Sequence, residues 1–298
     1  MLVFLDGVGI GPDDPERNPF LSARLPALRG LLGGMPTLDR PVMGTGAGCA
    51  FPLDATLGVQ GTPQSGTGQT ALLTGVNAAE RFGSHFGPWT PVALRPLLEQ
   101  ESLLRRAVKR GWPTAFATAY PRGWPEFGGR AHRRLAAPPL AARAAGLMTR
   151  HEGELARGEA IASEILNTGW REHLGHTELP VVTAAQAGAT LARIAAAHRL
   201  TFFAHYATDT AGHRGGMDGA VAALERVDEF LGGYLGAAPP DAVLLIASDH
   251  GNVEDVSGGH TRNPVLGVIA GPHAERRAAG LGSILDVTPA VLGWLDEE

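Results

Sequence analysis

Residues 243–264, VLLIASDHGNVEDVSGGHTRNP, restrict the fold more than any other part of this sequence. They open with a continuous apolar run, VLLIA, which is typical of a strand buried on both faces of a parallel sheet. Asp249 and His250 follow this run closely, and His260 lies ten positions after His250. Ligands bind at the carboxyl ends of strands in open α/β sheets, and Asp and His side chains suit a metal ion. The segment therefore predicts a metal site at a sheet edge, whereas an isolated Asp-His pair would indicate only a surface turn.

The start of the chain predicts a second buried strand. Residues 1–5 read MLVFL, and Asp6 comes at the end of this run, before the glycine-rich turn GVGIGP. Taken alone, Asp6 would be interpreted as a turn residue. If both strands belong to one sheet, however, Asp6 reaches the same edge as Asp249 and His250 and can join them.

A third predicted strand, residues 200–206, runs into the polar sequence TDTAGHRGG. In this sequence Asp209 and His213 are four positions apart. If residues 208–214 form a helical turn, that spacing places both side chains on one face, so they can share one cation. The pair therefore adds donors of the same chemical type at the end of another strand.

Residues 61–75, GTPQSGTGQTALLTG, read as a turn followed by a helix. The small residues at positions 65–68 permit close approach of the backbone to an anion. Ser65 at the start of a helix is by default an N-cap. Beside metal ligands, a serine in this position can instead ionise and act as a nucleophile, helped by the helix dipole. The residues alone leave both interpretations open.

Strands alternate with helices along the chain, which predicts an α/β fold with a doubly wound, mostly parallel sheet flanked by helices. We expect residues 1–119 and 186–298 to form the core, and residues 120–185, rich in Arg, His, Pro and Gly, to form a small inserted cap. Guanidinium groups of the cap could bind a phosphate or carboxylate bidentately, or could simply be solvated. The candidates are Arg122, Arg130, Arg133 and Arg134.

Charge and composition exclude several classes of partner. The formal net charge of -5 gives no indication of nucleic acid as a partner. The N-terminal apolar run lacks a basic region and is too short for a signal sequence or a membrane span. The single cysteine, Cys49, excludes an internal disulfide and fits a reducing compartment. We therefore expect a cytoplasmic protein without a membrane partner.

Four motifs, DGVGIG, DTAGH, SDHGN and GHTRNPV, together resemble the alkaline phosphatase superfamily. The resemblance is strongest to the branch that contains phosphopentomutase and cofactor-independent phosphoglycerate mutase, and it implies an alkaline phosphatase-like core. In the family the nucleophile lies ten positions before the glycine that ends the following helix motif, here Gly75, which selects Ser65. The sequence departs from both mutase families at Gln69, where they have histidine.

The resemblance also implies two metal sites. One would be held by Asp6, Ser65, Asp249 and His250, and the other by Asp209, His213 and His260. Carboxylates and neutral imidazoles fit Mn²⁺ or Zn²⁺ better than an all-oxygen cage for Mg²⁺. The implied chemistry is phosphoryl transfer from a small phosphorylated metabolite through a phosphoserine.

Several functions fit this chemistry. A phosphomutase passes the phosphoryl group to another hydroxyl of the same molecule, whereas a phosphatase passes it to water. A phosphodiesterase of the same superfamily and a non-catalytic binder of a phosphorylated ligand are further alternatives. A sulfatase is disfavoured, because Ser65 is followed by GTGQ and does not lie in the CxPSR or SxPSR motif.

Overall fold

The N-terminal strand β1 (Leu2–Leu5) lies inside a 7-stranded sheet with the order β2-β3-β7-β6-β1-β5-β4. These strands belong to a computed structural model, which describes residues 1–124 and 135–297. The other strands are β2 (Met43–Thr45), β3 (Gly48–Leu53), β4 (Thr114–Phe116), β5 (Leu200–His205), β6 (Leu244–Ala247) and β7 (Val265–Ala270).

The sheet is mixed. β6, β1, β5 and β4 run parallel, whereas β7 is antiparallel to β6 and continues through β3 to β2 in antiparallel pairs. β1, β5, β6 and β7 are buried at every position, as expected for strands covered on both faces. The predicted α/β fold is therefore confirmed, with an antiparallel edge on the parallel part of the sheet.

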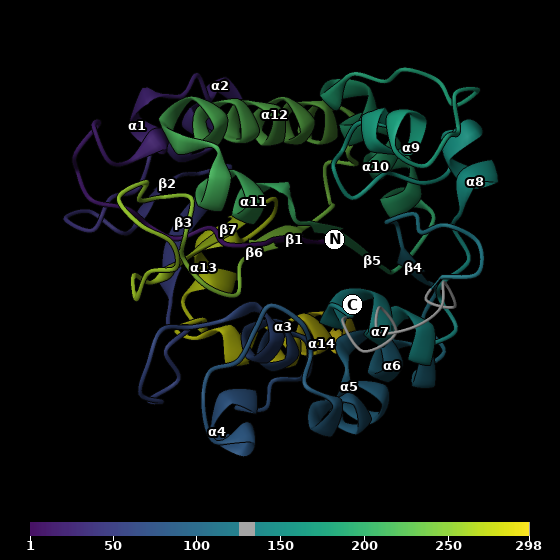
Figure 1. The fold of residues 1–298 in the computed structure, drawn as a ribbon, viewed down its shortest axis with the longest axis horizontal. Coiled ribbons are helices and arrows are strands. Elements are labelled where there is room, and N and C mark those ends of the chain that lie inside the picture. The colour runs from purple at the N-terminus through teal and green to yellow at the C-terminus, as the bar shows by residue number, and fades with distance from the viewer. Residues whose placement is uncertain (125–134, 298) are drawn as a thin grey trace.

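Helices cover both faces of the sheet (Figure 1). On one face lie α1 (Pro19–Ser22), α2 (Pro26–Leu32), α10 (Ala184–Ala196) and α12 (Gly216–Ala237). On the other face lie α3 (Ser65–Thr74), α5 (Arg95–Glu101), α6 (Leu103–Lys109), α7 (Ala137–Ala144), α13 (Ala274–Ala278) and α14 (Val287–Glu297), with α4 (Ala78–Phe82) packed on α3. The remaining described helices are α8 (Glu152–Ala156), α9 (Thr168–Glu172), α11 (Ala207–Arg214) and the short 3₁₀ turns Val92–Leu94 and Ile284–Asp286.

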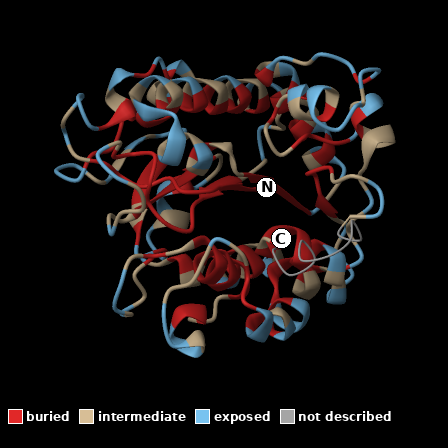
Figure 2. Cartoon of the chain, viewed as in Figure 1, coloured by how far each residue is buried: buried red, intermediate tan, exposed pale blue. Residues whose placement is uncertain are grey.

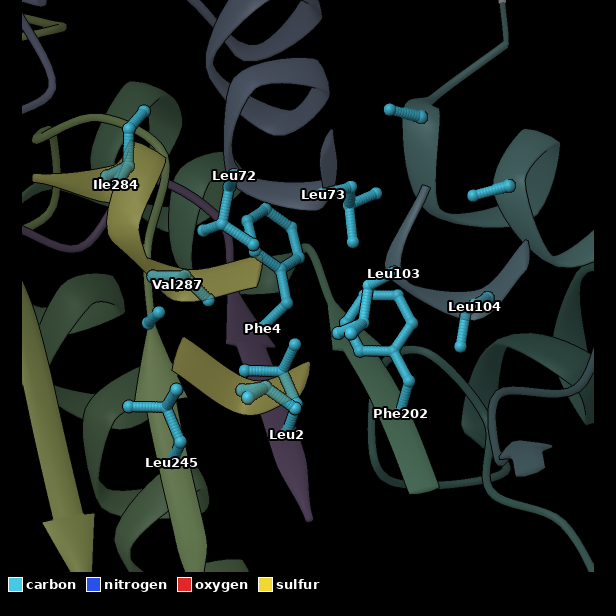
Figure 3. Close-up of a cluster of buried hydrophobic side chains, with 14 of the residues drawn as sticks. Leu2, Phe4, Leu72, Leu73, Leu103, Leu104, Phe202, Leu245, Ile284 and Val287 are labelled. Carbon is cyan, nitrogen blue, oxygen red and sulfur yellow. The ribbon is translucent and has the colours of Figure 1, made fainter. Parts of the chain in front are cut away.

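The two helical layers give two hydrophobic cores with the buried sheet between them (Figure 2). On the α3 side, Phe4 of β1 lies beside Leu72 of α3, and Leu2 of β1 belongs to the same core (Figure 3). All ten residues of α3 are buried, so this helix is fixed along its whole length. The helix that begins at Ser65 is therefore held rigidly against the sheet.

The segment expected to form a cap contains helices that pack in two places. α7 contacts α3, α5 and α6 and contributes Ala137 and Leu140 to the core of the α3 side. α8 and α9 contribute Leu155 and Trp170 to a separate small cluster. The division into a core and a cap over residues 120–185 stays a prediction. Among the described helices, none combines the length and the apolar character that crossing a membrane requires.

Candidate metal centre

Three neighbouring parallel strands end at the same edge of the sheet, and each delivers polar side chains to it. Asp6 follows β1, Asp249 and His250 follow β6, and α11, which carries Asp209, follows β5. β1 lies between β5 and β6 in the sheet order, so their carboxyl ends are adjacent. This strand order places all four residues at one edge of the sheet, where the sequence analysis expected them.

The first group of donors surrounds His250. Its Nε2 atom lies 2.9 Å from Ser65 Oγ, 3.3 Å from Asp6 Oδ1 and 3.7 Å from Asp249 Oδ2. All four side chains are buried. The structure thus brings together the four residues that the resemblance implies for one metal site.

The second group lies around Asp209 and is more accessible to solvent. The Nε2 atoms of His213 and His260 are 3.5 Å and 3.4 Å from carboxylate oxygens of Asp209. The same two nitrogen atoms are 2.9 Å from each other. Asp209 and His213 share a face of α11, as their four-residue spacing predicts.

The two groups adjoin at the imidazoles of His250 and His260, whose ring centroids are 3.8 Å apart. Donor atoms of Asp209, His250 and His260 all lie within 4.8 Å of one another, and so do those of Asp6, Asp249 and His250. His250 therefore faces both groups, whereas the resemblance implies it for the first alone. The division of ligands between two ions is part of the proposal below.

Two glycines allow this close packing. Gly7 has a φ of +68°, and a Cβ atom there would lie 2.6 Å from Asp209 Oδ1. A Cβ atom on Gly68 would lie 2.6 Å from the backbone oxygen of Asp249. A larger residue at position 68 would push α3 away from Asp249, and one at position 7 would push the turn after β1 away from Asp209, because contacts this short cannot be accommodated.

Electrostatics and hydrogen bonding both fit a divalent cation. Burial, together with the negative charge of Asp6, raises the pKa of Asp249 to about 8. Burial by itself lowers the pKa of His250, but the charges of Asp249 and Asp6 outweigh it and raise that pKa to about 10. Asp6 Oδ1 and Asp249 Oδ2 are buried without a hydrogen-bond partner among the described residues. Buried carboxylate oxygens of this kind are normally paired or bound to a metal, so the donors suit divalent metal ions.

Glu254 and Asn252, to which the sequence analysis gave no role, stabilise the loops that carry the candidate metal ligands. Glu254 is fully buried, and its Oε2 accepts hydrogen bonds from the backbone N–H groups of Gly9 and Asn252. Its Oε1 accepts from Thr261 Oγ1 and Asn263 Nδ2. The Asn252 side chain in turn donates to Asp209 Oδ1 at 2.7 Å. Glu254 thus ties together three segments that carry metal-site residues, and no spacing rule in the sequence indicates this.

Replacing Glu254 with glutamine is expected to destabilise the fold by at least about 2 kcal/mol, since an amide must turn its NH₂ group towards two of these donors. The loss is measured as a lower free energy of urea unfolding. Glu99→Gln, at an exposed position on α5, provides the control. Equal stability of the two variants would show that the Glu254 hydrogen bonds do not hold the loops.

A cavity of about 770 Å³ opens in front of Ser65. Its described lining consists of Thr62, Gln64, Ser65, Gly87, Pro88, Asp209, Thr210, His213, Arg214 and His260. Of these, Arg214 is the cationic side chain that lies beyond the ligand groups, at the end of α11. The cavity therefore offers space for a ligand that reaches both the nucleophile position and a guanidinium group.

The arginines predicted in the cap are placed differently. Arg122 is exposed and forms an ion pair with Glu152 at 3.2 Å, and it does not line the described cavity. Arg130, Arg133 and Arg134 lie outside the described residues. A substrate-binding role for these four residues stays a prediction.

The sequence of the chain has recognisable relatives. Residues 175–295 match the family model of the Metalloenzyme superfamily. The 2,3-bisphosphoglycerate-independent phosphoglycerate mutase of Desulforudis audaxviator is 38% identical over 95 residues, which are 29% of this chain and 19% of the mutase. The match thus spans about a fifth of the mutase. The resemblance to the phosphoglycerate mutase branch is confirmed as partial homology.

Solved structures share the fold over nearly the whole chain. The PH0037 protein from Pyrococcus horikoshii has a TM-score of 0.61 and 14% identity, and covers 100% of this chain and 96% of its own. A cold-active alkaline phosphatase from Shewanella sp. has a TM-score of 0.52 and 11% identity, with 99% of each chain covered. The alkaline phosphatase-like fold predicted from the motifs is confirmed.

Proposed function

We propose that this chain, as a relative of the Metalloenzyme superfamily, is a two-metal phosphotransfer enzyme that acts on a small phosphomonoester through a phosphoserine at Ser65. The observation that carries the proposal is the position of Ser65 Oγ. It lies 2.9 Å from His250 Nε2, at the first residue of a fully buried helix, and faces the cavity that Asp209 and His260 also line. Ser65 does not cap this helix as its position in the sequence suggested, because Gln64 is the N-cap residue and the Ser65 hydroxyl instead lies against His250.

In this proposal one divalent ion would be held by Asp6, Ser65, Asp249 and His250, and the other by Asp209, His213 and His260. Mn²⁺ and Zn²⁺ are the ions that suit carboxylate and imidazole donors. When bound, the two ions supply positive charge that favours an ionised serine and stabilises the phosphoryl group during an in-line displacement.

Ser65 carries the covalent step. Its Oγ atom, having lost its proton to solvent, forms a bond to phosphorus while the ester phosphorus–oxygen bond breaks, and the leaving oxygen takes up a proton. An acceptor hydroxyl then attacks the phosphoserine, loses its proton, and releases Oγ, which is reprotonated. The fixed position of α3 keeps Oγ in place through both steps.

The acceptor distinguishes two candidate activities. A phosphomutase is the first, because the sequence relatives are named as phosphoglycerate mutases. A phosphatase is favoured by one observation: none of the described residues between 120 and 185 lines the cavity. The described residues of this segment therefore do not shield a phosphoserine in the cavity from water. Hydrolysis is the second candidate activity.

Trapping the phosphoserine tests the proposal. The metal-loaded protein is mixed with a phosphomonoester that it consumes, quenched in acid, digested and analysed by mass spectrometry. We expect a phosphoryl group on the peptide that contains Ser65. Turnover accompanied by a phosphoryl group on another residue would contradict the proposal.

Arg214 is expected to select substrates that carry a second anionic group, because its guanidinium lines the cavity beyond the ligand groups. Arg214→Ala should raise KM for 3-phosphoglycerate about tenfold, as loss of a hydrogen bond between charged groups implies, and change KM for p-nitrophenyl phosphate little. Arg24→Ala, at a highly exposed position, is the control. An equal change in KM for both substrates would remove Arg214 from specificity.

A further inference from the structure

Gln69 lies on α3, one turn after Ser65, and is only 2% exposed. Its side-chain Nε2 donates a hydrogen bond to Asp6 Oδ2 at 3.1 Å. Its Oε1 accepts one from the backbone N–H of Ala137, the first residue of α7, at 3.3 Å. We propose that Gln69 is a positioning residue for the metal centre, which sets the orientation of the Asp6 carboxylate and thereby the affinity for one metal ion.

The Asp6 backbone is fixed without Gln69. Its N–H donates to the His205 oxygen at 2.9 Å, and its carbonyl oxygen accepts from Thr208 Oγ1 at 2.6 Å. These contacts leave rotation of the carboxylate about its terminal bond unrestricted. Gln69 supplies the restraint, because it holds Oδ2 and so directs Oδ1 towards His250 Nε2, 3.3 Å away.

The orientation of the Gln69 amide is itself determined. An amide can rotate by half a turn and exchange its oxygen with its NH₂ group. The N–H of Ala137 requires an acceptor, so it selects the rotamer with Oε1 towards α7 and Nε2 towards Asp6. The contact therefore connects the start of α7 to Asp6 through one buried, uncharged side chain.

The lack of charge on Gln69 has a consequence for metal binding. A glutamine donates to the Asp6 carboxylate without placing a positive charge beside it. Outer partners that orient a ligand in this way change metal affinity by about 10–100-fold when they are removed. The departure from the family's histidine at this position is therefore compatible with an intact metal centre.

The inference rests on the proposed two-metal function, and its test measures metal binding instead of turnover. Isothermal titration of the metal-free protein with Mn²⁺ is compared for the wild type, Gln69→Met and Thr74→Val. Gln69→Met keeps the side-chain length and removes the donor. Thr74→Val removes a buried hydrogen bond of the same helix, in which Thr74 Oγ1 donates to the Thr70 carbonyl oxygen at 2.7 Å. Thr74 is not a candidate metal ligand.

We expect Gln69→Met to weaken one of the two Mn²⁺ sites about 10–100-fold and to leave the other unchanged. Thr74→Val should lower the melting temperature and leave both sites at their wild-type affinity. If Gln69→Met does not fold, Gln69→Asn serves instead, because its shorter side chain cannot reach both partners. Wild-type affinity in the folded Gln69 variant would overturn the inference. A wild type that binds no Mn²⁺ would instead contradict the proposed function.

Discussion

Ser65→Ala is expected to reduce phosphoryl transfer by roughly 10⁴-fold or more, since removing a covalent nucleophile leaves only binding and electrostatic contributions. Metal content and folding should change little, because the other six candidate ligands remain and alanine fits a helix start that is already buried. The measurement combines turnover of p-nitrophenyl phosphate with elemental analysis of the same sample.

Ser22→Ala, at an exposed serine of α1, is the control for this substitution and should keep full activity. A Ser65→Ala enzyme that retained wild-type turnover would exclude Ser65 from the mechanism. Loss of both metal ions together with activity would also contradict the account, because it assigns Ser65 as only one of several ligands.

The second large effect is expected at Asp209. Asp209→Asn should empty one of two metal sites, since an amide is a poorer ligand and its NH₂ group would oppose the donors on Asn252 and the histidines. His260→Ala should empty the same site. Elemental analysis after dialysis is expected to give about one ion fewer per chain for each variant, with activity lost in both.

Asp218→Asn, an exposed position at the start of α12, is the matched control and should bind as many ions as the wild type. If Asp209→Asn and His260→Ala both retained the wild-type metal content, the assignment of these residues to a second ion would be wrong.

The fold and the position of the candidate site could be predicted from apolar runs that end at polar residues in the sequence. The buried runs before Asp6 and Asp249 are β1 and β6, and the run before the helical turn of Asp209 is β5. Because these strands are adjacent and parallel, their carboxyl ends meet, and residues far apart in the sequence form one centre.

Other features could not be predicted because they depend on tertiary contacts. Gln69 differs from the family pattern, and only the start of α7 beside it explains its orientation. α7 itself has a weak sequence signal, since APPLAARA contains prolines that are tolerated only in the first turn of a helix. Glu254 lies in a loop, and its role follows from four donors contributed by three segments.

The mixed sheet has a similar origin. The residues between β6 and β7 carry both SDHGN and His260, and this connection returns the chain antiparallel to β6. A purely periodic interpretation does not distinguish an antiparallel buried strand such as β7 from a parallel one, because both are continuous apolar runs. The direction of β7 is therefore fixed by the connection that carries the ligands.

Phosphorus NMR of the protein loaded with Mn²⁺ tests the central claim most directly, with ribose 1-phosphate, 3-phosphoglycerate and p-nitrophenyl phosphate as substrates. The account predicts that at least one phosphate ester is consumed and that a chelator stops its consumption. A signal that moves to another position of the same molecule identifies a mutase, and growth of inorganic phosphate identifies a phosphatase. No consumption by protein that holds two ions, or consumption that a chelator leaves unchanged, would contradict metal-dependent phosphoryl transfer.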